Sequence, residues 1–114
     1  MDEWKHILKD EFAGKEGSFL MTLRGEGKWS KTLFLRLFNA MVECCKANEG
    51  DDSIERWIAD GFWYLSWYVK QEAEEFGFNT KYYTNAITNL DHLAFWLFQN
   101  QGRSDGEFEP LNEI

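Results

Sequence analysis

Two histidines and the acids near them are the side chains of this sequence best suited to catalysis or metal binding. Asp60 and His92 would form a carboxylate–imidazole pair if the helices that carry them meet, and His6 is a further candidate. A metal centre needs a third ligand held by supporting hydrogen bonds, and the available carboxylate is Glu11. Glu11 follows His6 by five residues, which places the two on different faces of a helix. We therefore expect no metal and no cofactor, and an enzyme built on Asp60 and His92 is kept as a third hypothesis.

The sequence contains a cysteine pair and a candidate phosphate-binding loop, and in both cases the neighbouring residues argue against the corresponding chemistry. Cys44 and Cys45 are adjacent, a geometry that strains a disulfide, and their apolar surroundings would raise the thiol pKa. We expect them to act as small buried hydrophobic residues in a reducing cytosol. The segment Gly25–Ser30 resembles a phosphate-binding loop, but Trp29 separates the lysine from the serine and residue 23 is leucine instead of glycine. Nucleotide binding at this loop is not expected.

The composition describes a folded and acidic protein. Of the 114 residues, 44% are hydrophobic and 18% aromatic, including six tryptophans and ten phenylalanines, which excludes a disordered chain. A mass of 13.5 kDa fits one domain. Twenty acidic and twelve basic residues give a formal charge of −8, which argues against direct binding to a nucleic-acid backbone. The N-terminus is acidic and the apolar runs are far shorter than the ~20 residues of a membrane span, so we expect a soluble cytoplasmic protein.

Hydrophobic spacing predicts an all-α fold, a single-domain antiparallel bundle of about four helices. The antiparallel order is expected because the loops between these long helices are short. The helices are predicted at about residues 2–13, 30–47, 53–76 and 79–99. The helical domain would span residues 1–102, and residues 103–114 would form an acidic C-terminal tail or strap.

Capping residues set the expected ends of these helices. Ser30 is a typical cap for the second helix, and Asp52 with Glu55 resembles a capping box for the third. Gly77 is expected to end the third helix. Residues 18–28 leave two alternatives open, a helical turn or a short extended run followed by a glycine-containing loop.

The third predicted helix carries two tryptophans on the side opposite its apolar stripe. On a helical wheel the stripe consists of Ile54, Ile58, Phe62, Leu65, Val69, Ala73 and Phe76. The opposite side consists of Arg56, Asp60, Trp63, Trp67, Lys70, Gln71 and Glu74. The fourth helix shows a similar pattern, and the side chains outside its stripe are His92, Phe95 and Trp96.

Two explanations account for these tryptophans. In the first, the first helix, residues 18–28 and the tail cover the third and fourth helices on both sides. In the second, Trp63, Trp67 and Trp96 stay accessible and anchor a partner protein, because tryptophan buries a large area at a small entropic cost. An exposed aromatic cluster would otherwise be an aggregation liability.

Negative charge gathers in the same part of the chain. Residues 49–78 hold eight acidic and two basic residues, whereas residues 31–48 are net positive. One interpretation is a solvated face that keeps the protein soluble, and the other is electrostatic steering toward a basic protein. The second interpretation predicts a partner-binding surface made of Asp60, Trp63, Trp67, Glu74, Glu49, Asp51 and Asp52.

The chain is small, carries a charge of −8, contains a tryptophan-rich segment from Trp57 to Trp67 and lacks catalytic motifs. In these features it is similar to bacterial toxin-immunity proteins, including those of contact-dependent growth inhibition systems. The resemblance implies a non-enzymatic protein that binds a cognate toxin and occludes its active or substrate-binding surface, and many such toxins are basic nucleases. Phage-encoded inhibitors of host defence share this profile. The resemblance lies in composition and assigns no individual residue.

The leading hypothesis is therefore an inhibitor or immunity protein, monomeric or homodimeric, whose partner is a cognate toxin or another basic protein. It involves no direct contact with nucleic acid or membrane. The alternative is a helical module that binds a small apolar ligand, or self-associates through its aromatic faces, as a regulatory subunit.

Overall fold

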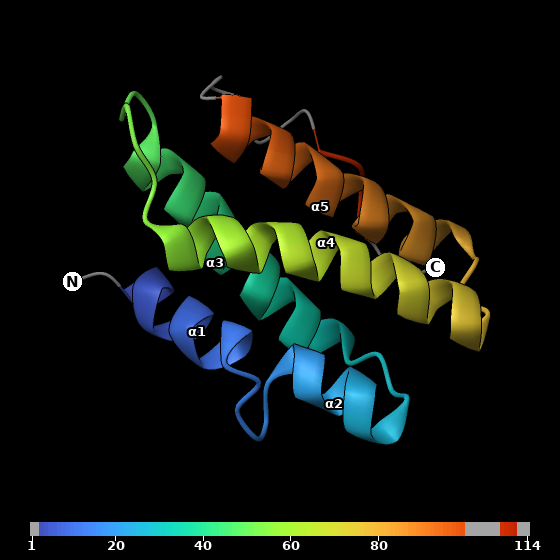
Figure 1. Ribbon diagram of the computed structural model, residues 1–114. Helices are drawn as coiled ribbons and strands as arrows, with labels where there is room; N and C mark the ends of the chain where they lie inside the picture. The colour runs from blue at the N-terminus through green and yellow to red at the C-terminus, as the bar shows by residue number, and fades with distance from the viewer. Residues whose placement is uncertain (1–2, 100–107, 112–114) are drawn as a thin grey trace. The chain divides into compact units, whose positions relative to one another are not determined.

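The computed structural model describes residues 3–99 and 108–111, and the regular secondary structure of these residues is entirely α-helical (Figure 1). The elements are α1 (Glu3–Phe12), α2 (Phe19–Glu26), α3 (Lys31–Asn48), α4 (Arg56–Phe76) and α5 (Lys81–Gln99). They fall into two compact units, Met1–Ala47 and Asn48–Ile114. The all-α prediction is confirmed with five helices where about four were expected, and the single domain over residues 1–102 stays a prediction.

The additional helix is α2, which settles the alternatives that the sequence left open for residues 18–28. Ser18 caps it, because the side-chain oxygen accepts a hydrogen bond from the backbone N–H of Met21 at 3.1 Å. The Glu11 carboxylate accepts two more, from the N–H groups of Phe19 at 3.1 Å and Leu20 at 2.6 Å. The first N–H groups of a helix have no partner within it, so this carboxylate stabilises an eight-residue helix that would be marginal alone.

An aromatic cluster joins α2 to the start of α3 in the first unit. The ring centroids of Phe19, Trp29 and Phe34 lie 5.0–5.3 Å apart. Ser30 caps α3 as predicted, and its hydroxyl accepts a hydrogen bond from the N–H of Leu33 at 3.2 Å. Further along α3 the buried side chains are Leu37, Phe38, Ala40, Met41, Val42, Cys44 and Cys45. The two cysteines are therefore packed as small apolar residues, as their surroundings predict.

The second unit is built on α4 and α5, which run antiparallel and pack side by side (Figure 1). The face of α4 turned to the core buries Ile58, Gly61, Phe62, Leu65, Val69 and Ala73. The predicted capping box of Asp52 and Glu55 is wrong. The helix begins at Arg56, and Glu55 takes the extended N-cap conformation without a side-chain hydrogen bond to the helix.

Gly77 ends α4 as predicted, and a substitution there should be destabilising. Its φ of 74° is left-handed, and its N–H bonds the carbonyl of Ala73. A Cβ would meet nothing within 4 Å, so Gly77→Ala should lose about 1 kcal/mol of unfolding free energy through backbone strain alone. The matched control is Gly25→Ala, inside α2 and equally open, which should gain up to about 1 kcal/mol. Urea unfolding of both variants tests this, and shifts of the same sign would contradict it.

Candidate functional site

The face of α4 opposite its core stripe is exposed along its whole length. The seven residues of this tryptophan face, Arg56, Asp60, Trp63, Trp67, Lys70, Gln71 and Glu74, are all solvent-exposed. Trp63 keeps 63% of its surface accessible and Trp67 keeps 49%. The structure thus leaves Trp63 and Trp67 uncovered, as the second explanation requires, and their role in anchoring a partner stays a prediction. Monomeric soluble proteins seldom present such large apolar side chains next to each other, which marks the face as a candidate site.

The two tryptophans stack on each other. Their indole rings are stacked with centroids 6.2 Å apart and an interplanar angle of 1°. Tyr64 lies 6.2 Å from Trp67 and stacks on Tyr68 at 5.5 Å, which extends the aromatic surface around the helix. Tyr68 in turn donates a hydrogen bond to Glu72. Because a tryptophan side chain has only two rotatable torsions, little side-chain entropy is lost when a partner covers these rings.

Trp96, which the sequence offered as a further accessible tryptophan, is buried. Only 2% of its surface is accessible, and its ring lies 6.4 Å from that of Phe108 in the C-terminal segment. Of the described tail residues, Phe108 therefore lies against α5, as the first explanation expects of the tail. Phe76, assigned to the core stripe, is 49% exposed because it is the last residue of the helix, and its ring lies tilted against that of Phe78 with the centroids 6.0 Å apart.

A polar link next to the tryptophan face ties α4 to α5. Asp91 accepts a hydrogen bond from the Ser66 hydroxyl at 2.7 Å and pairs with the Lys70 ammonium at 3.0 Å. Phe95, one helical turn beyond Asp91, is 47% exposed, and the antiparallel order puts it at the same end of the link as Trp63. The sequence placed Phe95 outside the apolar stripe of α5 without including it in the site. Its position outside the apolar stripe is the sequence feature that could have identified it as part of the exposed surface.

On the other side of the link, α4, α5 and the turn between them line an open groove of about 370 Å³. Its lining residues are Lys70, Ala73, Glu74, Phe78, Asn79, Thr84, Ile87 and Thr88. Lys70 and Glu74 belong to both the groove and the tryptophan face, so the two features form one continuous surface. A separate groove of about 510 Å³ in the first unit lies between α1 and α3, where Trp4, Ile7 and Arg36 are among its lining residues.

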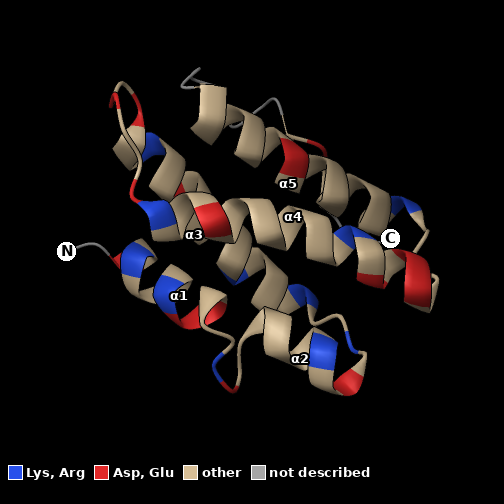
Figure 2. Ribbon diagram, viewed as in Figure 1, with Lys and Arg blue, Asp and Glu red and all other residues tan. Residues whose placement is uncertain are grey.

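Negative charge is concentrated in the unit that carries the tryptophan face. Residues 48–114 contain thirteen acidic and four basic residues, whereas residues 1–47 contain seven and eight. Glu49, Asp51 and Asp52 are exposed in the loop that precedes α4, where Figure 2 shows acidic residues. The tail acids Asp105, Glu107 and Glu113 lie outside the described residues. A basic protein would be attracted to this unit before contact.

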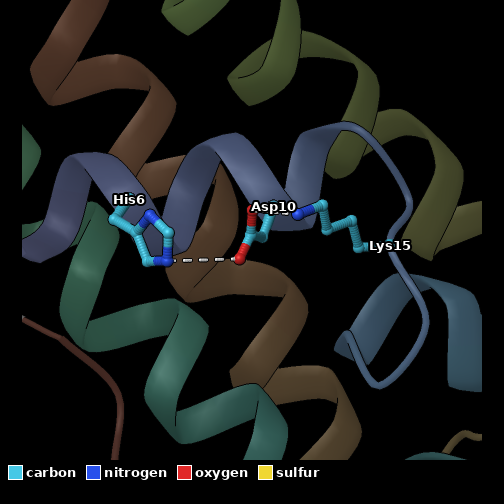
Figure 3. A network of polar contacts seen from close by, with 3 residues as sticks. All are labelled: His6, Asp10 and Lys15. Atoms are coloured by element: carbon cyan, nitrogen blue, oxygen red, sulfur yellow. Dashed lines mark ion pairs between the residues drawn. The ribbon is translucent and has the colours of Figure 1, made fainter.

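The residues considered for catalysis are not brought together. Asp60 is exposed on α4, whereas the ring of His92 on α5 lies 6.4 Å from Phe108, and no hydrogen bond joins the two in the part of the chain that the structure describes. His6 pairs with Asp10 at 3.5 Å, and Lys15 reaches the other Asp10 oxygen at 3.4 Å (Figure 3). Residues 3–99 and 108–111 offer no cluster of three His, Cys, Asp or Glu side chains suited to a metal ion.

Glu11, the carboxylate considered as a metal ligand, is buried and bonded to the start of α2. Desolvation raises the pKa of its carboxyl group above the ordinary value, against the opposing effects of the Leu20 and Phe19 hydrogen bonds and the Arg36 charge. Both carboxylate oxygens are already occupied by backbone N–H groups. The residue therefore has a structural role in capping α2.

Comparison of the chain with protein-family models, with curated proteins and with solved structures finds no match. Within the described residues, none of the five helices combines the length and the apolar character needed to cross a membrane.

Proposed function

We propose that this protein is a non-enzymatic inhibitor of the immunity type, which binds a basic cognate toxin in the cytoplasm and occludes its active or substrate-binding surface. The observation that carries the proposal is the exposed, stacked pair of Trp63 and Trp67. This pair belongs to the unit of residues 48–114, in which acidic residues outnumber basic residues thirteen to four. An apolar anchor inside a negative field suits a positively charged protein surface, such as the cleft of a nuclease.

The two parts of this surface have different roles in the proposed complex. The acids around the tryptophans, Asp60 and Glu74, together with the loop that precedes α4, attract the partner and raise the association rate. The tryptophans supply the desolvated contact that slows dissociation, as buried aromatic residues do at the centre of interfaces. Binding of this kind survives moderate salt, because the apolar contact is not screened.

The proposal is tested by capturing partners of the tagged protein when it is co-expressed with the genes that flank its own. We expect one basic protein to be retained in equal amount at roughly 0.5 M salt, where surface charge contacts are largely screened. It should be lost with the double variant Trp63→Ala/Trp67→Ala. It should be kept with Leu35→Ala, which removes an apolar side chain that is also 49% exposed but lies in the first unit. Capture that ignores the tryptophans, or no capture, would overturn the proposal.

Charge reversal in the loop before α4 should slow association without removing the complex. Asp51→Lys/Asp52→Lys changes two exposed acids that precede the helix. We expect the association rate constant to fall about tenfold at low salt and its salt dependence to weaken, with little change in the dissociation rate. Stopped-flow mixing with the captured partner at several salt concentrations measures this. Reversal of Glu43 on α3 is the control, since it lies in the other unit.

A further inference from the structure

The C-terminal segment Phe108–Leu111 lies on α5 in the manner of a bound peptide. Asn89 is fully buried and forms two hydrogen bonds with the main chain of Glu109. Its Nδ2 donates to the Glu109 carbonyl at 2.9 Å, and its Oδ1 accepts from the Glu109 N–H at 2.7 Å. A side-chain carboxamide that bonds both the N–H and the carbonyl of one residue recognises the main chain of that residue, whichever side chain it carries. Glu109 is thus held without any contribution from its exposed carboxylate.

The residues on each side of Glu109 are contacted differently. The ring of Phe108 lies 6.4 Å from both His92 and Trp96. The carbonyl of Pro110 accepts a hydrogen bond from Asn85 Nδ2 at 3.0 Å, and no N–H is required at this position, which suits proline. The contacts move back along α5 from Trp96 to Asn85, so the segment runs antiparallel to the helix. Main-chain bonds with alternate side-chain contacts are the usual means of recognising extended peptides.

We propose that this surface of α5, the strap site formed by Asn85, Asn89, His92 and Trp96, is a peptide-binding site. Its ligand is an extended segment in which an aromatic residue stands two positions before a proline, and residues 108–111 are the resident ligand. Two polar atoms of the site, His92 Nδ1 and Trp96 Nε1, are buried without a hydrogen-bond partner among the described residues. The resident segment gives neither atom a hydrogen-bond partner, and a ligand in trans would take its place on α5. The inference is independent of the tryptophan face.

The test is an NMR titration of the full-length chain with the capped tetrapeptide Phe-Glu-Pro-Leu. In the wild-type chain the tethered segment competes at an effective concentration in the millimolar range, so binding in trans should be weak. In the variant Phe108→Ala/Pro110→Ala the competitor is weakened, and the peptide should bind about tenfold more tightly, with shifts centred on the Asn89 side-chain amide. Equal affinity for both chains, or no binding to the variant, would overturn the proposal.

Two further comparisons exclude a nonspecific contact or a misfolded variant. The peptide Phe-Ala-Pro-Leu should bind as well as Phe-Glu-Pro-Leu, because only the main chain of the second residue is read, whereas Ala-Glu-Pro-Leu should not bind. In the Phe108→Ala/Pro110→Ala chain, where the resident segment competes less, Asn85→Ala removes a single hydrogen bond from a half-buried residue, so the fold is retained. This variant should weaken peptide binding several-fold while the helical circular dichroism stays unchanged. Binding that tolerates loss of the aromatic residue would contradict the assigned specificity.

Discussion

Replacing Trp67 with alanine is expected to weaken binding of the captured partner about thirtyfold, which corresponds to about 2 kcal/mol. The substitution removes one of the two stacked rings, and it also removes the contact that fixes Trp63 and Tyr64 on the same helix. Most of the lost affinity should appear as faster dissociation, because the tryptophan contributes after encounter. Isothermal titration calorimetry gives the affinity, and surface plasmon resonance separates the two rates.

The stability of the unbound protein should change much less. Trp67 is half exposed, so its truncation removes only part of a tryptophan's burial together with the ring stacking, and we expect a loss of about 1 kcal/mol of unfolding free energy. Leu35→Ala, at a residue exposed to the same extent in the first unit, is the control for removing apolar surface. An affinity loss as large for Leu35→Ala as for Trp67→Ala would contradict a localised anchor. A large loss of unfolding free energy in Trp67→Ala would show instead that the ring has a structural role.

Replacing the buried Glu11 with alanine should cost about 2 kcal/mol or more of unfolding free energy at neutral pH. We expect this to be the largest loss among substitutions of the acidic residues. The substitution leaves the buried N–H groups of Phe19 and Leu20 without acceptors and removes a negative charge from the start of α2. Asp10→Ala is the matched control on the same helix. It breaks only the partly exposed pairs with His6 and Lys15, which are worth at most about 1 kcal/mol. Urea unfolding of both variants measures the difference, and equal losses would contradict the capping role.

Glu11 should also leave a signature in the pH dependence of stability. Its pKa is raised in the folded state by desolvation, so the folded protein binds a proton more tightly than the unfolded chain does. The resulting stabilisation is fully present below the unfolded value of 4.5 and is lost as pH rises through the folded pKa. Glu11→Gln does not titrate, so its unfolding free energy should lack this decline. A variant that follows the wild-type curve from pH 4.5 upward would contradict the assignment.

The sequence predicted the long helices, because the periodic spacing of their hydrophobic residues is visible within each segment. The wheel of α4 identified every residue of the exposed tryptophan face, because a 21-residue helix repeats its pattern often enough to define two sides. Ser30 and Gly77 were recognised from local capping rules. Whether the tryptophans were covered could not be read from the wheel, because coverage depends on where other segments pack.

The features that the sequence did not predict rest on contacts between distant residues. The helix α2 has only eight residues, and beside its Ser18 cap it depends on Glu11, which lies eight and nine positions before the N–H groups it binds. The ring of buried Trp96 lies 6.4 Å from that of Phe108, and Asn89 meets Glu109 across 20 residues of sequence. No local pattern marks such pairs. On a helical wheel of α1, Glu11 is the polar member of a stripe with Trp4, Ile7, Leu8 and Phe12, which is the one sequence feature that sets it apart.

Oxidative footprinting of the tryptophans, in the free protein and in its complex, tests the central claim most directly. The account predicts that hydroxyl radicals modify Trp63 and Trp67 readily in the free protein, where they are 63% and 49% exposed, and that partner binding protects both. Trp96, at 2% exposure, is an internal reference that should react slowly in either state. If Trp63 and Trp67 are oxidised as fast in the complex as in the free protein, the tryptophan face is not the binding surface.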